Sequence, residues 1–237
     1  MTRELQQATV NLYEMQLGRK QAELEYLRSQ INPHFLYNTL EAIQGIALEH
    51  GVPKIADATG ALGKLFRHNI QGSDMIPLGK ELEITQAYLT IQKLRFADKL
   101  NVLISIRENT RGIPVMKLLL QPLVENAVYH GLEPKTGPGT LFIGARLENG
   151  GICSSAFMTM AWGMPSGRLA ALQEELERPA ASGKAETAHI GLLNVQHRIR
   201  LRYGMPYGLT LHSTPGGGTR VTVRVPAQTQ EEENELC

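Results

Sequence analysis

His34 follows Pro33 directly and stands at the start of an amphipathic segment. A neutral imidazole is nucleophilic near pH 7, so a histidine that solvent can reach can accept a phosphoryl group where serine would need a dedicated base. Proline favours the first turn of a helix, and Asn38 lies one helical turn after His34, where its amide can orient the ring. We therefore interpret His34 as a candidate phosphoacceptor and Asn38 as its partner. The alternative is a solvated histidine without a chemical role.

A second group of polar residues, Glu125, Asn126, His130 and Gly131, lies at the end of a helix predicted from Met116 to Tyr129. Phosphoryl transfer from ATP needs the triphosphate held in place and Mg²⁺ bridging its oxygens. Asn126 and His130 share one face of a helix, so the amide oxygen can reach Mg²⁺ while the imidazole reaches a phosphate. Glu125 is the nearest candidate for a general base. The alternative is an ordinary helix with a polar exposed side.

Two later segments can approach a nucleotide through backbone or hydroxyl groups. Gly191 opens a predicted helix that continues with Leu192 and Asn194, and the free N–H groups at a helix start can bind phosphate closely where no side chain intervenes. Thr219 follows the glycines 216–218, and its hydroxyl can bond the adenine side of a pocket. The glycines themselves are equally consistent with a simple hairpin turn.

The composition is that of an ordinary globular protein of one or two domains. The 237 residues carry a net charge of +1 and two cysteines, Cys153 and Cys237. We expect no nucleic-acid partner on grounds of charge, no disulfide framework, and a reducing compartment. No stretch is apolar enough to span a bilayer, so we expect the chain as given to be soluble and cytoplasmic.

The first thirty residues repeat apolar side chains every seven positions. Val10, Leu17, Leu24 and Ile31 form this seam, surrounded by charged and amide side chains. The spacing predicts a coiled-coil stalk over residues 1–30 and favours a dimer. The alternative is a single amphipathic helix packed on its own domain.

The remaining periodicity predicts an α+β fold. Apolar residues at helical spacing from 38 to 69, around the break at 51–53, predict a helical hairpin, and Pro77 starts a third helix over 78–96. After residue 100 strands and helices alternate. We expect strands at 102–106, 141–147, 152–158, 209–212 and 219–225, helices at 116–129, 166–177 and 192–203, a lid at 179–188, and an acidic disordered tail at 227–237.

Two strings carry a family resemblance. Residues 30–40 (QINPHFLYNTL) and 118–131 (LLLQPLVENAVYHG) resemble motifs of the LytS/YehU-type sensor histidine kinases, and the likeness extends over nearly the whole chain. It implies a coiled-coil and helical-hairpin dimerisation region followed by a GHKL (Bergerat) α/β sandwich ATPase domain. The implied divisions are a stalk at 1–30, a helical phosphoacceptor region at 31–100, an ATP-binding kinase domain at 101–226, and the tail at 227–237.

The resemblance also implies roles for particular residues. Asn126 corresponds to the Mg²⁺ ligand of the family's N-box, which continues through His130 and Gly131, and the string from Gly191 through Leu192 to Asn194 resembles its second glycine box. The implied cofactors are ATP and Mg²⁺. The implied partners are a second copy of the chain, the receiver domain of a response regulator, and a membrane through an N-terminal sensor region that the sequence lacks.

One expected motif is altered. An Asp-x-Gly-x-Gly segment should follow the strand near Ile152, its aspartate accepting from the adenine amino group. Aligned on Gly163, this chain has Thr159 in place of the aspartate, Ala161 in place of the first glycine, and the bulky Trp162 between them and Gly163. A buried amino group without its acceptor costs about 1 to 3 kcal/mol, roughly a five- to hundredfold loss of affinity.

The genetic code suggests an origin for this alteration. Read one frame away, Met158-Thr159 forces the codon GAC, Met160-Ala161 forces GGC, and the pair 162–163 forces GGG, which together spell Asp-x-Gly-x-Gly. We hypothesise a compensated pair of frameshifts affecting about residues 154–162, in the gene or in its sequencing. Resequencing that returns the same bases rules out a sequencing error.

Three functions compete. The first is an ATP-dependent histidine kinase of a two-component system. The second is a catalytically impaired pseudokinase, a dimeric scaffold, because Thr159 and Ala161 spoil the adenine pocket. The third is a different GHKL ATPase, such as a topoisomerase or chaperone relative, and the sequence around His34 argues against it.

Overall fold

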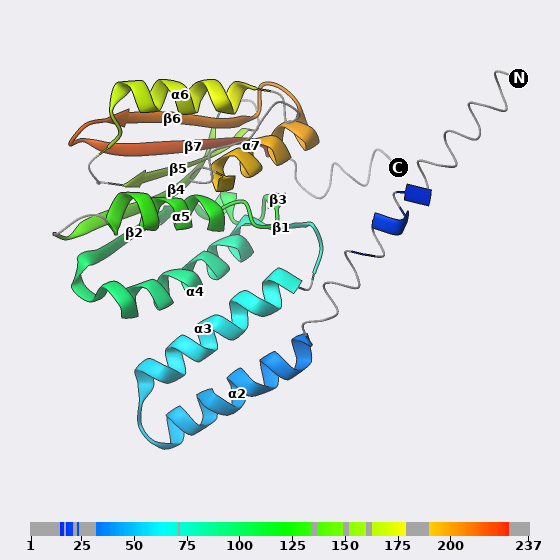
Figure 1. The fold of residues 1–237 in the computed structure, drawn as a ribbon, viewed down its shortest axis with the longest axis vertical. Helices are drawn as coiled ribbons and strands as arrows, with labels where there is room; N and C mark the ends of the chain where they lie inside the picture. The colour runs from blue at the N-terminus through cyan, green and yellow to red at the C-terminus, as the bar shows by residue number, and fades with distance from the viewer. Residues whose placement is uncertain are drawn as a thin grey trace, which may run out of the picture. The chain divides into compact units, whose positions relative to one another are not determined.

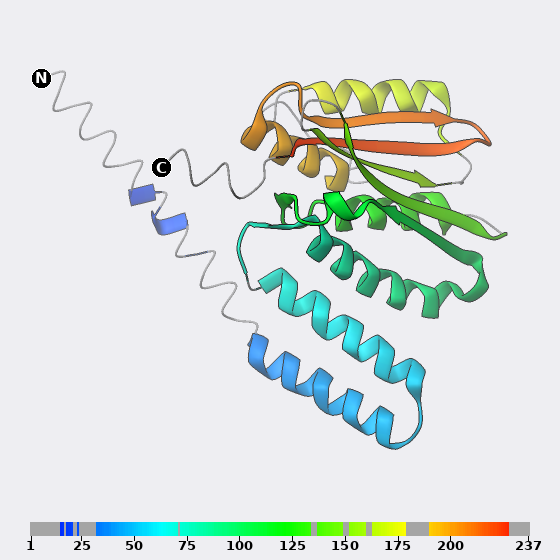
Figure 2. The same ribbon diagram turned by 180° about the vertical axis from the view of Figure 1, so that it is seen from behind.

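The computed structural model describes residues 15–16, 18–20, 23, 32–70, 72–133, 137–148, 152–159, 163–178 and 190–227, with the backbone alone at 132, 152–159 and 190. The chain divides into two compact units, residues 1–70 and 71–237 (Figures 1 and 2). The predicted lid lies outside the described residues, and so does the predicted tail after Ala227. Of the predicted stalk only six residues are described, all helical, so the coiled coil stays a prediction.

The first unit contains the predicted helical hairpin. Helix α2 (Pro33–Glu49) and helix α3 (Pro53–Ile70) pack through small and apolar side chains. Gly51 makes the turn with a positive φ of 65°, a conformation that glycine adopts without strain. The helices approach closely at Gly60, where a Cβ atom would lie 2.6 Å from the side-chain nitrogen of Gln44. The buried side chains of the hairpin are Tyr37, Leu40, Ala47, Ala56, Ala61, Leu65 and His68.

The second unit is built on a five-stranded sheet with the order β2-β4-β5-β7-β6. The strands are β2 (Leu100–Ile106), β4 (Gly139–Glu148), β5 (Ile152–Thr159), β6 (Gly208–Thr214) and β7 (Gly218–Pro226). Only the β2–β4 pair is parallel. A separate antiparallel pair joins β1 (Met75–Pro77) to β3 (Pro114–Met116), and the sequence did not predict it.

The helices of this unit pack on one face of the sheet. They are α4 (Leu78–Phe96), α5 (Gln121–Asn126), α6 (Ser166–Glu177) and α7 (Ile190–Tyr203), and a π-helical segment η3 (Ala127–Leu132) continues α5. In β7 the buried Val221, Val223 and Val225 alternate with less buried residues, as expected for a sheet covered on one side. The chain is therefore a mixed helix-and-strand protein, as predicted. None of its described helices is both long and apolar enough to cross a bilayer.

The helix predicted from Met116 begins five residues later, at Gln121, so that prediction was wrong at its start. Met116 ends β3, and residues 117–120 form a turn in which Leu118 has a positive φ of 57°. That conformation interrupts any helix, and apolar periodicity carries no signal for it.

A buried carboxylate holds this turn. Glu81 of α4 is 1% exposed; its Oε1 accepts from the backbone N–H of Leu118 at 2.7 Å, and its Oε2 accepts from those of Leu119 and Leu120 at 3.0 and 3.1 Å. These N–H groups stand at the start of α5, where a helix has no backbone acceptors of its own and favours negative charge. From α7, Arg198 donates to the carbonyl oxygens of 117 and 118. Side chains from other helices therefore bind both the N–H groups and the carbonyl oxygens of this turn.

We expect Glu81→Gln to lower the free energy of unfolding by about 3 kcal/mol, because it removes charge-assisted hydrogen bonds and points an amide N–H₂ at buried donors. Urea denaturation followed by circular dichroism measures the change. Glu83→Gln, two residues along, is the control: Glu83 is exposed and forms a surface ion pair with Lys80 at 2.8 Å, so the loss of its charge should matter little. Equal effects from the two substitutions would contradict the role of Glu81.

Candidate functional site

The two parts of the predicted site lie in different units, and each has its own geometry. In the first unit, His34 is exposed in the first turn of α2. Asn32 caps that turn by accepting from the backbone N–H of Phe35 at 3.2 Å. The amide nitrogen of Asn38 lies 3.3 Å from Nδ1 of His34, so the predicted pair is in contact. The second ring nitrogen, Nε2, does not take part in this contact.

Near this pair, Glu41 is already engaged. Its carboxylate accepts from Arg67 of α3 at 3.2 Å, an ion pair that joins the two helices of the hairpin. Phe35, immediately after His34, is 68% exposed. The exposed surface around the imidazole is therefore apolar on one side and formed by the Asn38 amide on another.

In the second unit, the predicted N-box residues lie where α5 changes into the π-helical segment η3. Asn126 is the last residue of α5 and is half-buried, while His130 and Gly131 belong to η3. Tyr129 contacts His130 edge-on, with ring centroids 4.9 Å apart. Segments of π-helix are rare and often occur at functional sites. A π turn holds slightly more residues than an α turn, so Asn126 and His130 remain on one side, as predicted.

Glu125 is oriented toward protein groups. Its Oε1 accepts from the side-chain amide of Gln121 at 2.7 Å. Burial, and after it the negative charge of Glu125, raises the pKa of Tyr88 on α4 to about 12, while Arg95 acts in the opposite direction. Glu125 therefore lies near α4. Its role as a general base stays a prediction, and its neighbours indicate a structural role as well.

The predicted second glycine box lies against the N-box helix. A Cβ atom placed on Gly191 would lie 3.8 Å from the ring of Pro122, so the first turns of α7 and α5 are adjacent. Leu192 is 1% exposed and belongs to the core, so only its backbone can face a ligand. The side chain of Asn194 is exposed on α7.

The third part of the predicted site gathers around the turn between β6 and β7. Thr159 stands opposite Thr219 in the register of β5 and β7. Gly163 has a φ of +70°, and a Cβ atom there would come within 1.9 Å of the carbonyl oxygen of Thr214. Only glycine fits this approach, which agrees with the alignment that placed Gly163 in the Asp-x-Gly-x-Gly motif. Residues 160–162, with Ala161 and Trp162, lie outside the described residues.

Ser213 connects these elements, although no sequence pattern predicted its role. Its hydroxyl accepts from the backbone N–H of Met164 at 2.7 Å, donates to the carbonyl of Gly218 at 3.1 Å, and lies 2.8 Å from the hydroxyl of Thr219. A pocket of about 150 Å³ opens beside this network, lined by residues 212–214 and 217–220. The hydroxyl of Thr219 is therefore held in place at the edge of a cavity.

The structure thus places the predicted residues of the second unit in two groups: Asn126, His130 and Gly131 follow the helix whose first turn lies against Gly191, and Thr159 lies with Gly163 and Thr219. The donor set suits Mg-ATP: Mg²⁺ commonly takes one or two protein oxygens and completes its shell with phosphate and water, and an asparagine amide supplies one such oxygen. The functional residues that sequence reasoning missed are Glu81, Arg198 and Ser213. Each acts on a partner far away in the sequence.

Comparisons with known proteins identify relatives of this chain. The family model for histidine kinase matches residues 22–100. The sensor histidine kinase YesM of Bacillus subtilis is 37% identical over 220 residues, which cover 92% of this chain and 35% of YesM. The sensor histidine kinase YpdA of Escherichia coli is 35% identical over 209 residues, which cover 87% of this chain and 34% of YpdA.

Among solved structures, the histidine kinase domain of the Erythrobacter litoralis EL346 blue-light activated histidine kinase aligns with 82% of this chain and 96% of that chain, at 16% identity and a TM-score of 0.46. The chain spans about a third of the length of the curated relatives it matches. On the sequence matches and the motifs around His34 and Asn126, the chain belongs to the LytS/YehU-type sensor histidine kinase family.

Proposed function

We propose that this chain is the kinase portion of a two-component sensor: it transfers the γ-phosphoryl group of ATP to His34, which passes it to an aspartate of a response regulator. The observation that carries the proposal is the exposed imidazole of His34 in contact with Asn38. A ring nitrogen of His34 forms the bond to phosphorus, the bond from that phosphorus to the leaving oxygen of ADP breaks, and the ring gives up its proton. Mg²⁺ neutralises charge on the phosphates.

Asn38 is proposed to select the reactive tautomer of His34. An amide can present either its nitrogen or its oxygen to the ring, because the two are exchanged by a half-turn of the side chain. With the oxygen facing Nδ1, the amide accepts from Nδ1–H and leaves Nε2 with its lone pair free to attack. The contact of 3.3 Å places the amide within reach for that arrangement.

The nucleotide site is proposed in the second unit. Asn126 would hold Mg²⁺, His130 and Gly131 the phosphates together with the backbone of 191–194, and Thr219 with Gly163 the adenine side. We retain the proposed divisions at residues 30, 100 and 226 for the stalk, phosphoacceptor region, kinase domain and tail. We also propose that the whole protein is a membrane-anchored receptor with its kinase portion in the cytoplasm.

The proposed partner of the first unit is a second copy of the chain. Seven large apolar side chains of the hairpin are exposed, among them Phe35, Ile46 and Leu48 at 68, 59 and 63%. So many exposed apolar groups on 39 residues favour burial against another molecule, and a hairpin of two helices can pair with its copy into a four-helix bundle.

We expect the chain to sediment as a dimer at tens of micromolar, and Ile46→Asp to weaken the dimer about tenfold or more, because a carboxylate would be buried without a partner. Leu201→Asp is the control, since Leu201 is 90% exposed on α7 of the second unit. Sedimentation equilibrium of the three proteins measures the dissociation constant of each dimer. A monomeric unchanged chain, or equal association of the two variants, would contradict a dimer formed through the hairpin.

Incubation with γ-labelled ATP and Mg²⁺ tests the phosphoacceptor. We expect acid-labile label on the unchanged chain and none on His34→Ala, because the variant lacks the imidazole that is proposed to accept the phosphoryl group. His50→Ala is the matched control: His50 is exposed at the other end of α2, and its Nδ1 lies 2.9 Å from the carbonyl oxygen of Ile46. Label that survives in His34→Ala, or is lost equally in His50→Ala, would refute the assignment.

The pseudokinase stays the second candidate, because Thr159 and Ala161 replace the residues expected to bind adenine. Thr159 lies in the central strand β5, opposite Thr219, so a carboxylate at this position would sit at the end of the strand nearest the Ser213–Thr219 network.

We expect Thr159→Asp combined with Ala161→Gly to tighten ATP binding roughly five- to hundredfold, the range given by one restored acceptor for the adenine amino group. Fluorescence titration with ATP, and with GTP as the control nucleotide that lacks this amino group, measures the change. Equal gains for both nucleotides would show that the substitutions act in some other way, and no gain would remove the damaged-pocket explanation.

A further inference from the structure

Three residues of α4 recur at intervals of seven: Glu81, Tyr88 and Arg95. Seven residues make nearly two helical turns, with a drift of about 20° per step, so the three side chains leave α4 on one side. This stripe faces the segment of the chain that carries Asn126, the candidate Mg²⁺ ligand. The segment in question, residues 118–133, comprises the turn before α5, α5 itself and η3.

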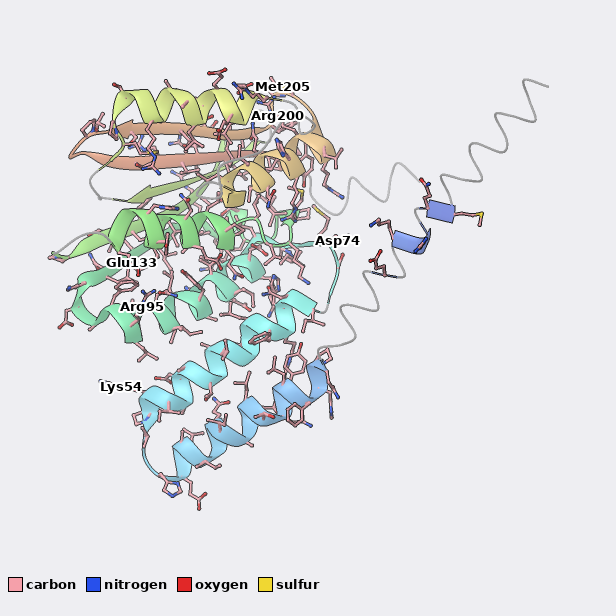
Figure 3. The ribbon with its side chains drawn as sticks, viewed as in Figure 1. Lys54, Asp74, Arg95, Glu133, Arg200 and Met205 are labelled. Carbon is pink, nitrogen blue, oxygen red and sulfur yellow. The ribbon has the colours of Figure 1, made fainter. Side chains whose placement is uncertain are left out.

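Each member of the stripe meets a different part of the segment. Glu81 accepts from the N–H groups of residues 118–120 at its start. Tyr88, between the other two residues on α4, is partly buried against the core and lies near enough to the segment for the negative charge of Glu125 to contribute to the raised pKa of the tyrosine. Arg95 forms an ion pair with Glu133 at its end (Figure 3). Each partner lies 37 to 39 positions further along the chain, so the helix and the segment run in the same direction in a fixed register.

The charges match the ends of the segment. At the start, where unpaired N–H groups create a partial positive charge, α4 presents a carboxylate; at the end, where Glu133 stands, it presents a guanidinium. A shift of α4 by one helical turn would separate Glu81 and Arg95 from their partners at the same time. The contacts therefore favour one register over its neighbours.

We propose that Glu81 and Arg95 are positioning residues that fix segment 118–133 on α4 and thereby set where Asn126 and His130 stand. The consequence for ATP rests on the proposed kinase function. The register itself rests on the contacts alone, and this allows the two to be tested separately.

The test uses the full chain with Arg95→Glu, with Glu133→Arg, and with both substitutions. Arg95 is 59% exposed, so these variants should fold. We expect amide hydrogen exchange in peptides covering 121–133 to become roughly 1.5- to fivefold faster in each single variant, as for the loss of one partly exposed ion pair, and to return to the original rate in the charge-swapped double variant.

Arg178→Glu is the matched control. This substitution breaks the ion pair between Arg178 and Glu174 on α6, whose charged atoms lie 2.7 Å apart. Arg178 is about as exposed as Arg95, and its substitution should leave exchange in 121–133 unchanged.

Autophosphorylation gives the functional readout. We expect the single charge variants to raise KM for Mg-ATP more than they lower kcat, and the double variant to restore KM. The proposed register would be wrong if the single variants exchanged their amide hydrogens at the original rate. It would also be wrong if exchange in the double variant were as fast as in the single variants. A chain that shows the expected exchange pattern but never labels His34 would support the register and refute the kinase function, so the two failures are distinct.

Discussion

The second unit depends on the carboxylate of Glu81, which is almost completely buried. The turn at 117–120 must bring the chain from β3 into α5 inside the core, and its N–H groups have no acceptor in either element. Each such group left unpaired costs about 1 to 3 kcal/mol, and a buried carboxylate left alone costs more. Glu81 and the turn therefore stabilise each other, and Arg198 completes the arrangement from α7. Through this one turn, α4, β3, α5 and α7 are fixed with respect to one another.

The sequence predicted those elements whose cause is local. Helices 78–96 and 166–177 have the predicted bounds because a proline precedes each and the apolar residues keep helical spacing. The start of α5 was predicted five residues early, because its cause is Glu81, some 38 positions away. For the same reason nothing predicted the β1–β3 pair, which joins residues 75–77 to 114–116. Long-range hydrogen bonds leave no periodic pattern in the sequence.

In the candidate site, too, local features could be predicted and long-range contacts could not. The contact of His34 with Asn38 could be predicted because residues four apart on a helix are neighbours. The closeness of Gly163 to the turn of β6 and β7 was anticipated only through the family motif, and its physical cause, the missing space for a Cβ atom, needed the structure. Ser213 had no signal at all, since its hydroxyl acts on atoms from two other segments. The π-helical segment at the N-box likewise has no recognised sequence pattern.

Helix α4 belongs to one region by sequence and to another by packing. The histidine kinase family model continues from the hairpin to residue 100, so it treats the hairpin and α4 as one stretch. Yet Leu78, Leu82 and Leu89 are buried in the core of the second unit, and the first N–H groups of α4 donate to the carbonyls of 113 and 111. Moving α4 away from that unit would expose these leucines and separate Glu81 from its donors. A conformational change that starts in the hairpin must therefore either end before Leu78 or move α4 together with the segment that carries Asn126.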